Sequence, residues 1–280
     1  MVDRYAVIGN PVGHSKSPQI HAAFAAQTGQ AMVYERVLGV PGQFEEQVRS
    51  LLRDGLRGLN VTLPFKERAL ALADQATPRA RLAGAANTLH LSEGGLLADN
   101  TDGIGLARDL RRLGVQITGG RLLILGAGGA VRGILGPLLE QRPACVHIHN
   151  RTEARALVLA EAFAAHPGGR ALAVIGTEAL PDAHAYDLVI NGTSASLAGA
   201  SLALPSSLFA AAGAAYDLAY RLEGATVFLE EAQRAGAATL ADGLGMLVEQ
   251  AAEAFALWRG IHPDSLPVLQ ALRSAPPSPQ

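Results

Sequence analysis

The segment 121–140 constrains the fold of this 280-residue chain more than any other part of the sequence. An apolar run over 121–125 has the length of a buried strand, and apolar residues recur at helical spacing over 131–139. The turn between them contains Gly126, Gly128, Gly129 and Ala130. Glycine lets the backbone turn tightly and approach a diphosphate, whose charge the free N–H groups of a helix N-terminus stabilise. An ordinary strand-to-helix turn is the alternative, but a strand before and a helix after favour a dinucleotide site.

The end of the next apolar run, 145–149, indicates which dinucleotide fits. A domain that binds NAD usually ends this strand in Asp or Glu, which grips the ribose 2′-hydroxyl. Here the run is followed by Asn150, Arg151 and Thr152, with Arg155 close behind. A planar guanidinium forms paired hydrogen bonds to a phosphate. We therefore predict NADP(H) as the cofactor, although the two arginines could also begin the solvated face of a helix.

Strand and helix patterns alternate along the whole chain. Apolar runs over 171–175, 187–191 and 214–218 are separated by helix-length segments, which predicts a doubly wound parallel sheet. The first hundred residues show a second α/β pattern that includes a hairpin turning at 92–95. We expect an α/β protein of two domains: an N-terminal substrate domain over 1–102 and a Rossmann-like NADP-binding domain over 103–240. The C-terminal helical segment, 241–273, is expected to return to the first domain.

Composition narrows the classes of function. Hydrophobic residues make up 49% of the chain and charged residues 17%, which argues against intrinsic disorder. The net charge of −2 gives no basic footprint for a nucleic acid, and no apolar run is long enough to cross a membrane. Cys145 is the only cysteine, which excludes an internal disulfide. Without a signal-peptide pattern or a His and carboxylate cluster, we expect a cytoplasmic protein that binds no metal.

Lysine is rare in this chain. Only Lys16 and Lys66 are lysines among 23 basic residues. The scarcity is most simply a compositional bias toward arginine. A lysine that remains can nevertheless serve as a proton donor, which arginine cannot, because a guanidinium holds its proton too tightly. The surroundings of Lys66 favour this second interpretation.

Short polar motifs recur in a fixed order along the chain. In the first domain they are 10–18, 60–66, 87–88 and 99–103; after the glycine turn they are 189–194, 216–220 and 242–250. Together with the glycine turn, this ordered set resembles the shikimate dehydrogenase family over nearly the whole chain. The resemblance implies reversible, NADPH-dependent reduction of 3-dehydroshikimate to shikimate, a step of chorismate and aromatic amino-acid biosynthesis. It also implies a substrate cleft between the two domains.

The resemblance assigns roles to individual residues. Lys66 and Asp102 match the catalytic pair. Six side chains match the substrate contacts: Ser15 and Ser17 for the carboxylate with Tyr220 assisting, and Thr62, Asn87 and Gln250 for the ring hydroxyls. The cofactor side comprises the glycine turn, the adenosine-phosphate clamp of Asn150, Arg151, Thr152 and Arg155, and two further positions, Thr193 and Gly243.

The chemistry of Lys66 and Asp102 agrees with this assignment. Reduction of a ketone puts negative charge on its oxygen as hydride arrives, and a nearby ammonium group stabilises that charge and delivers a proton. We expect Lys66 to be charged near neutral pH, with Asp102 orienting it and accepting a substrate hydroxyl. The alternatives are structural: Lys66 could be a solvated residue at a helix start, and Asp102 a helix N-cap. Ser17 could likewise cap a helix that begins at Pro18, and Asn60 and Asn87 could form turns.

One departure and two alternative functions remain open. Ala195, Ser196 and Leu197 stand where the family often has small residues and glycine, in a loop that lies near the nicotinamide in relatives. Within enzymes, the alternative is a quinate/shikimate dehydrogenase that uses NAD or NADP. Outside enzymes, it is a non-catalytic NADP-binding regulator on the same fold. We expect a small-molecule substrate, no nucleic-acid or membrane partner, and a monomer or homodimer.

Overall fold

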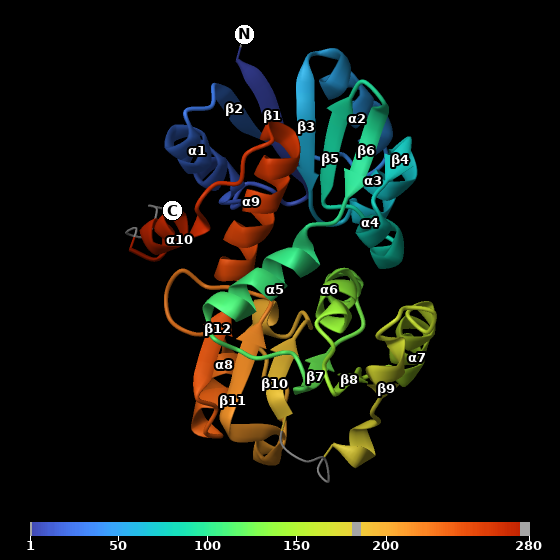
Figure 1. The fold of residues 1–280 in the computed structure, drawn as a ribbon, viewed down its shortest axis with the longest axis vertical. Helices are drawn as coiled ribbons and strands as arrows, with labels where there is room; N and C mark the ends of the chain where they lie inside the picture. The colour runs from blue at the N-terminus through green and yellow to red at the C-terminus, as the bar shows by residue number, and fades with distance from the viewer. Residues whose placement is uncertain (1, 181–185, 275–280) are drawn as a thin grey trace. The chain divides into compact units, whose positions relative to one another are not determined.

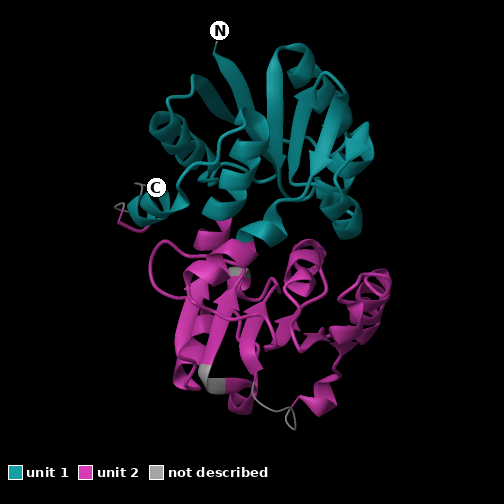
Figure 2. Cartoon of the chain, viewed as in Figure 1, with its two compact units in different colours: residues 1–105, 248–272 teal, residues 106–247, 273–280 magenta. Residues whose placement is uncertain are grey.

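The computed structural model describes residues 2–180 and 186–274, and the chain divides into two compact units (Figure 2). Unit 1 comprises 1–105 and 248–272, and unit 2 comprises 106–247 and 273–280. The chain passes from one unit to the other inside α5 (Asp102–Arg112), α9 (Leu244–Arg259) and α10 (Ser265–Ser274). None of the described helices combines the length and the apolar character that a membrane span requires.

Unit 1 contains a mixed six-stranded sheet with the order β2-β1-β3-β5-β6-β4 (Figure 1). Its strands are β1 (Asp3–Gly9), β2 (Met32–Leu38), β3 (Leu56–Val61), β4 (Gln75–Ala76), β5 (Thr88–Ser92) and β6 (Gly95–Asp99). β1 pairs in parallel with β2 and β3, as β4 does with β6, whereas β5 runs antiparallel to β3 and β6. The β5–β6 hairpin confirms the turn predicted at 92–95. The helices before α5 are α1 (Ser17–Thr28), α2 (Phe44–Arg53), α3 (Lys66–Leu72) and α4 (Pro78–Ala83).

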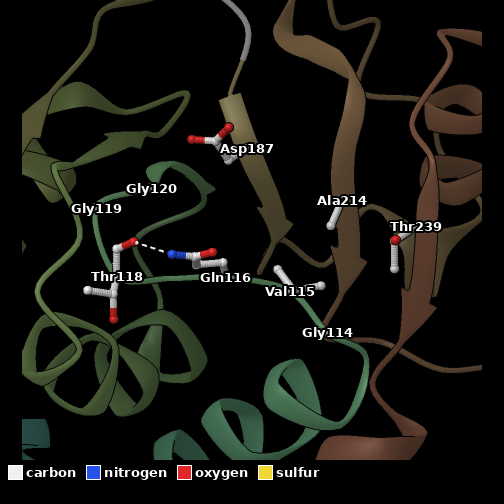
Figure 3. Close-up of a pocket in the computed structure, with 9 residues that line it drawn as sticks. All are labelled: Gly114, Val115, Gln116, Thr118, Gly119, Gly120, Asp187, Ala214 and Thr239. Atoms are coloured by element: carbon white, nitrogen blue, oxygen red, sulfur yellow. Dashed lines mark hydrogen bonds between the residues drawn. The ribbon is translucent and has the colours of Figure 1, made fainter.

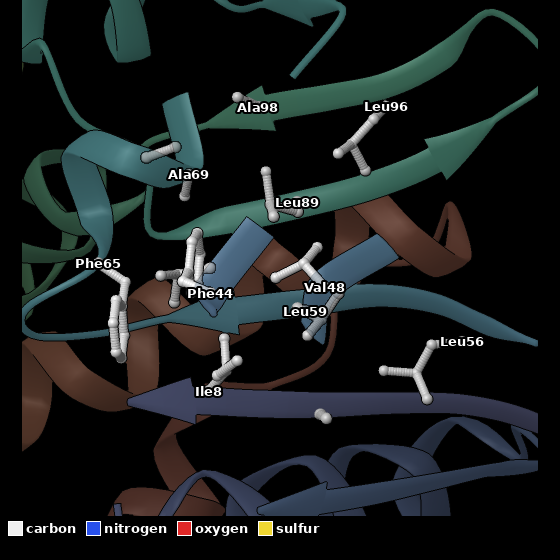
Figure 4. Packing of buried hydrophobic residues seen from close by; sticks show 13 residues of the cluster. Ile8, Phe44, Val48, Leu56, Leu59, Phe65, Ala69, Leu89, Leu96 and Ala98 are labelled. Atoms are coloured by element: carbon white, nitrogen blue, oxygen red, sulfur yellow. The ribbon is translucent and has the colours of Figure 1, made fainter. Parts of the chain in front are cut away.

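An apolar core joins this sheet to α2 and α3 (Figure 4). Phe44 of α2 and Phe65, which precedes α3, stack with ring centroids 4.7 Å apart. Ile8, Leu59 and Leu89 bring three neighbouring strands into the same fully buried cluster. Truncating one such leucine to alanine costs about 2–5 kcal/mol of stability. This packing fixes the start of α3, where Lys66 lies.

Helix α9 is fixed to the sheet of unit 1 through Trp258. The Trp258 ring stacks on Tyr5 of β1 at 4.7 Å, and its Nε1 donates a hydrogen bond to the Leu89 carbonyl at 3.0 Å. Gly58 of β3 leaves room for this contact, because a Cβ there would lie 2.5 Å from Trp258 Nε1. The part of α9 within unit 1 confirms that a C-terminal helix returns to the N-terminal sheet.

Unit 2 contains a fully parallel six-stranded sheet with the order β12-β11-β10-β7-β8-β9. Its strands are β7 (Arg121–Leu125), β8 (Cys145–His149), β9 (Leu172–Val174), β10 (Tyr186–Asn191), β11 (Phe209–Asp217) and β12 (Thr239–Asp242), and its α-helices include α6 (Gly129–Glu140), α7 (Glu153–Ala162) and α8 (Val227–Arg234). The strand order reverses between β7 and β10, which is the doubly wound Rossmann arrangement. Ligands of such sheets bind beyond the carboxyl ends of the strands, at this switch point. The predicted doubly wound sheet is confirmed.

Candidate active site

Lys66 and Asp102 form an ion pair in unit 1. Lys66 is the first residue of α3 and Asp102 the first residue of α5. Lys66 Nζ donates to Asp102 Oδ2 at 2.5 Å, with the two side chains 24% and 10% exposed. The pair is therefore sheltered but reachable, as a proton donor must be. The Asp102 carboxylate is occupied by side-chain contacts, so its proximity to a helix start does not make it only a cap.

Asn87 and Gln250 complete a compact cluster with this pair. Asn87 Nδ2 donates to Asp102 Oδ1 at 2.8 Å and lies 3.1 Å from Gln250 Oε1. Asn87 follows α4 and precedes β5, whereas Gln250 comes from α9, 163 residues further along the chain. Both side chains are buried. The fold thus brings four sequence-predicted residues together, and this arrangement offers a cation, an anion and two amides to a polyol.

An ion pair between Arg79 and the buried Asp99 holds the chain three residues before Asp102. Asp99, 1% exposed, accepts a bidentate hydrogen bond from Arg79 and a further one from Thr77 Oγ1 at 2.6 Å. Arg79 also reaches Glu253 of α9 at 2.9 Å. The neighbouring carboxylates raise the pKa of Arg79 above its ordinary value, against the opposing effect of its own burial. These contacts fix the end of β6, from which the chain leads to Asp102 at the start of α5.

Ser15 and Ser17 lie at the start of α1. Ser15 Oγ donates to Ser17 Oγ at 3.1 Å and accepts the backbone N–H of Ser17 at 3.3 Å. The cap residue of α1 is Lys16, so the helix starts one residue earlier than the Ser17 cap that we considered from the sequence. Asn60, considered as a turn former, instead lies buried in β3. Two adjacent hydroxyls at this helix start can donate to a carboxylate.

Thr62 follows directly after β3. Its N–H donates to the Ile8 carbonyl at 2.9 Å, and a Cβ on Gly9 would lie 2.2 Å from Thr62 Cγ2. Gly9 is therefore required for Thr62 to approach the end of β1. Thr62 is half-buried at the carboxyl ends of two parallel strands. No hydrogen bond is described between its side chain and the Lys66 cluster.

The glycine turn of unit 2 connects β7 to α6 by a tight turn. Gly126 has φ +106°, and a Cβ there would lie 3.0 Å from the Gly192 carbonyl oxygen, so this position requires glycine. Gly128 caps α6, and Gly128, Gly129 and Ala130 are exposed. No described atom lies within 4 Å of a Cβ built on Gly128 or Gly129. The twelve-residue α6 thus begins beside open space, and a helix N-terminus of this kind favours an anion.

The predicted phosphate clamp lies after β8, the strand next to β7. Gly126 N–H donates to the carbonyl of His149, the last residue of β8, at 2.7 Å, which ties the glycine turn to this loop. Asn150 Nδ2 donates to the Thr152 carbonyl at 2.8 Å and shapes the turn into α7. Arg151 and Arg155 are exposed. Both guanidinium groups lie at the surface after β8, and their contact with a 2′-phosphate stays a prediction.

Thr193, Gly243 and Tyr220 follow the neighbouring strands of unit 2. Thr193 Oγ1 donates to Asn191 Oδ1 at 2.8 Å, and a Cβ on Gly243 would lie 2.2 Å from the Leu218 carbonyl oxygen. Gly243 thus has a packing reason as well as its predicted cofactor role. Tyr220 is half-buried, and burial followed by the Asp242 charge raises the pKa of its phenol.

Within 195–197, where the sequence departs from the family pattern, Ser196 forms hydrogen bonds to neighbouring side chains of unit 2. Ser196 Oγ donates to Asp217 and accepts from Asn191 Nδ2 at 2.9 Å, and Thr226 Oγ1 donates to the same carboxylate at 2.6 Å. Burial raises the pKa of Asp217. The serine hydroxyl therefore ties this loop to the end of β11. The side chain of Leu197 lies outside the described residues.

A cavity of about 350 Å³ lies at the opposite edge of the same sheet (Figure 3). It is lined by Gly114, Val115, Gln116, Thr118, Gly119, Gly120, Asp187, Ala214 and Thr239. Except for Ala214, which lies within β11, these residues precede or begin the strands, whereas the glycine turn follows one. None of the predicted site residues lines it. Among the described residues, no group of three or more His, Cys, Asp or Glu could hold a metal ion.

A Rossmann unit with a dinucleotide turn, joined to a unit with a Lys–Asp pair among amides, defines a nicotinamide-dependent dehydrogenase. Family models identify which one: the shikimate dehydrogenase substrate binding domain matches residues 7–89, shikimate / quinate 5-dehydrogenase matches 108–199, and the shikimate 5'-dehydrogenase C-terminal domain matches 243–273. The chain belongs to the shikimate dehydrogenase family, which confirms the resemblance seen in its motifs.

Relatives that match nearly the whole chain are named shikimate dehydrogenase (NADP(+)). A shikimate dehydrogenase (NADP(+)) of Methylobacillus flagellatus is 53% identical over 98% of this chain and 100% of its own length. That of Thioalkalivibrio sulfidiphilus is also 53% identical, over 99% and 100%. Among solved structures, an Ael1 enzyme from Pseudomonas putida matches with a TM-score of 0.90 and 47% identity, covering 96% of this chain and 98% of that one. Shikimate 5-dehydrogenase from Thermus thermophilus, in complex with NADP(H) and shikimate, matches with 0.86 and 38%, covering 98% and 99%.

Proposed function

We propose that the chain catalyses the reversible NADP-dependent interconversion of 3-dehydroshikimate and shikimate. The observation that carries this proposal is the Lys66–Asp102 ion pair at 2.5 Å, with Asn87 and Gln250 beside it. NADPH, when bound, supplies the hydride. Curated relatives named for this activity match the chain over nearly its whole length, so the match covers both units.

Lys66 is the proton donor in the direction of ketone reduction. As negative charge develops on the ketone oxygen, the ammonium at Nζ stabilises it and transfers a proton to it. Asp102 Oδ2 holds Nζ in place, and Asp102 Oδ1 is held by Asn87, so the ammonium is aimed by two linked contacts. In the oxidation of shikimate, the Lys66–Asp102 pair accepts the alcohol proton, which Nζ takes up in its neutral amine form.

The remaining predicted residues bind without reacting. The Ser15 and Ser17 hydroxyls donate to the substrate carboxylate with Tyr220, and Thr62, Asn87 and Gln250 satisfy ring hydroxyls. A buried amide left without its partner is costly, so this set rejects analogues that lack a hydroxyl. In unit 2, the residues after β7 and β8 would hold the diphosphate and the 2′-phosphate, with Thr193 and Gly243 in the adjacent loops.

The test is the appearance of reduced nicotinamide absorbance in four mixtures: shikimate or quinate, each with NADP⁺ or NAD⁺. Fast reduction of NADP⁺ by shikimate, with the other three mixtures far slower, supports the proposal. Equal or faster rates with quinate or NAD⁺ would instead place the chain on the quinate/shikimate branch. NADP⁺ binding without turnover in any mixture would indicate a regulator.

Location and assembly are further proposals. We propose that the protein works in the cytoplasm, supported by its single, half-buried cysteine, which needs no oxidising compartment. We also propose a monomer or homodimer. Fractionation of cells and light scattering of the purified chain test these two statements.

A further inference from the structure

His21 is a buried histidine that the proposed mechanism does not use. It lies in α1 with 0% exposure, stacked on Tyr34 at 4.2 Å and surrounded by Phe24, Phe255 and Trp258. Burial lowers its pKa to about 3. Histidine in such a setting is neutral, so one ring nitrogen donates a hydrogen bond and the other can only accept.

A continuous set of hydrogen bonds joins His21 to the Lys66–Asp102 pair. Asn60 Oδ1 lies 2.7 Å from Tyr34 Oη and 3.2 Å from His21 Nε2. Asn60 Nδ2 donates to Thr88 Oγ1 at 3.1 Å, and Thr88 Oγ1 donates to Asn87 Oδ1 at 2.9 Å. Asn87 Nδ2 then donates to Asp102 Oδ1. Tyr34 also shares a hydrogen bond with Ser17, so the same set of hydrogen bonds reaches a residue predicted to bind the substrate carboxylate.

Backbone groups fix the direction of this set at two points. The Asn87 carbonyl can only accept, and it lies 3.3 Å from Asn60 Nδ2, so the amide nitrogen of Asn60 faces Asn87. The Thr101 N–H can only donate, and it lies 2.9 Å from Asn87 Oδ1, so the amide nitrogen of Asn87 faces Asp102. Asn60 Oδ1 must therefore accept from both Tyr34 and His21.

The tautomer of His21 follows from this direction. Its proton resides on Nε2, opposite Asn60 Oδ1, and Nδ1 is unprotonated. Within the described part of the chain, buried Nδ1 has no hydrogen-bond partner, which suits a bare acceptor nitrogen better than an N–H. Either the other tautomer or a charged ring would place an unsatisfied N–H among aromatic rings.

We infer that His21 is a positioning residue for the Lys66–Asp102 pair, acting as a neutral Nε2–H donor that, with Tyr34, locks Asn60 and through it Asn87. Thr101 N–H sets which way the Asn87 amide faces, and the Asn60–Thr88 contacts support that amide from the other side. Without this support Asn87 Nδ2 would hold Asp102 Oδ1 less firmly, and Asp102 would hold Lys66 Nζ less firmly. His21 touches no reacting group. The inference rests on the proposed function for its kinetic readout, but not for its tautomer.

The kinetic test compares three variants in NADP⁺ reduction by shikimate. His21→Phe keeps an aromatic ring and removes the donor, and we expect kcat to fall about tenfold with little change in the KM for NADP⁺. His21→Gln restores an amide N–H at similar reach, and we expect kcat within about threefold of the unmodified chain. Phe24→Leu, on the same helix and in the same aromatic cluster, is the packing control and is expected to stay within about twofold.

Three kinetic results would overturn the inference. They are a folded His21→Phe variant with unchanged kcat, a His21→Gln variant as slow as His21→Phe, and a Phe24→Leu variant that loses as much kcat as His21→Phe. If the unmodified chain itself does not oxidise shikimate, the proposed function fails. The NMR measurement of the His21 tautomer then tests the hydrogen-bond network by itself.

The tautomer is measured on the unmodified chain with ¹⁵N-labelled histidine by long-range ¹H–¹⁵N NMR. The resonance that His21→Gln removes identifies His21, and a neutral ring protonated on Nε2 at both pH 7 and pH 5 is expected. A ring protonated on Nδ1, or an imidazolium at pH 5, would overturn the inference without any use of activity.

Discussion

The predicted ligand-binding groups of the two units differ in kind: side chains in unit 1 and mainly backbone in unit 2. In unit 1 most of the predicted site residues are buried or half-buried and hydrogen-bonded to neighbouring side chains, as in the Ser15–Ser17 pair and the cluster of Asn87, Asp102 and Lys66. In unit 2 the outer part of the glycine turn, 128–130, and Arg151 are exposed and present backbone N–H groups and a surface charge. A polyol ring with defined stereochemistry needs side chains held at fixed angles, whereas a flexible diphosphate needs only positive charge and an open helix end. Unit 1 therefore depends on interlocked side chains, and unit 2 on backbone shape.

The largest effect is expected inside the interlocked cluster. Asp102→Ala removes the anion that holds Lys66 Nζ and the acceptor of Asn87, so we expect kcat to fall about a thousandfold. Steady-state oxidation of shikimate at saturating NADP⁺ measures it. Asp54→Ala, an exposed acid of the same unit, is the matched control and should leave kcat within about twofold. Near-normal kcat in Asp102→Ala would show that the cluster is not catalytic.

The buried polar groups of unit 1 also make stability sensitive to acid. The pKa of His21 is lowered to about 3 in the fold, against about 6.5 in the unfolded chain. As pH falls below the unfolded value, the unfolded chain takes up a proton that the folded chain does not, so stability decreases on acidification. Between pH 6.5 and 5 the contribution is about 2 kcal/mol. Urea unfolding at both pH values should show that His21→Gln loses less stability than the unmodified chain, and equal losses would contradict this.

Substitutions at the predicted cofactor site of unit 2 are expected to change the affinity for the cofactor and not the rate of the chemical step. Arg151→Ala should raise the KM for NADP⁺ about tenfold, because one charge-assisted contact to the 2′-phosphate is lost. The KM for NAD⁺, which lacks that phosphate, should change little. Arg170→Ala, another exposed arginine of unit 2, controls for net charge. If both cofactors weaken equally, Arg151 does not contact the 2′-phosphate.

The smallest expected effect is on stability, and it differs between two glycines of the same turn. Gly128→Ala introduces a Cβ into open space at φ −89°, so the free energy of unfolding should change by no more than about 0.5 kcal/mol. Gly126→Ala, at φ +106° against the Gly192 carbonyl, should cost about 1–3 kcal/mol. Thermal and urea unfolding of both variants measure the difference. Equal losses would mean that Gly128 also serves the fold.

Unit 2 was the easier half to predict from the sequence. A strand, a glycine turn and a helix are local features, and the parallel sheet follows from their alternation. The pairing of Lys66 with Asp102 is different: it joins residues 36 positions apart, and only the family resemblance suggested it before the structure did. Short elements such as β4 and α4 escaped notice because two to six residues carry no periodicity.

The positioning network of unit 1 could not be read from the sequence at all. Nothing in the sequence distinguishes His21 from a structural histidine, and Asn60 fits a turn residue equally well. Their roles depend on partners from β2, β3 and β5, and on backbone groups that set the direction of each amide. Polar residues at buried strand positions, such as Asn60 and Thr88, are the one available signal, because burying them requires a partner.

The most direct test of this division of labour is single-turnover formation of NADPH from shikimate at saturating NADP⁺, in Lys66→Ala and Arg151→Ala side by side. The account predicts that Lys66→Ala is slower by about a thousandfold with unchanged NADP⁺ affinity, whereas Arg151→Ala reacts within about twofold of the unmodified rate once its cofactor site is filled. Rapid chemistry in Lys66→Ala, or slow chemistry in saturated Arg151→Ala, would contradict it.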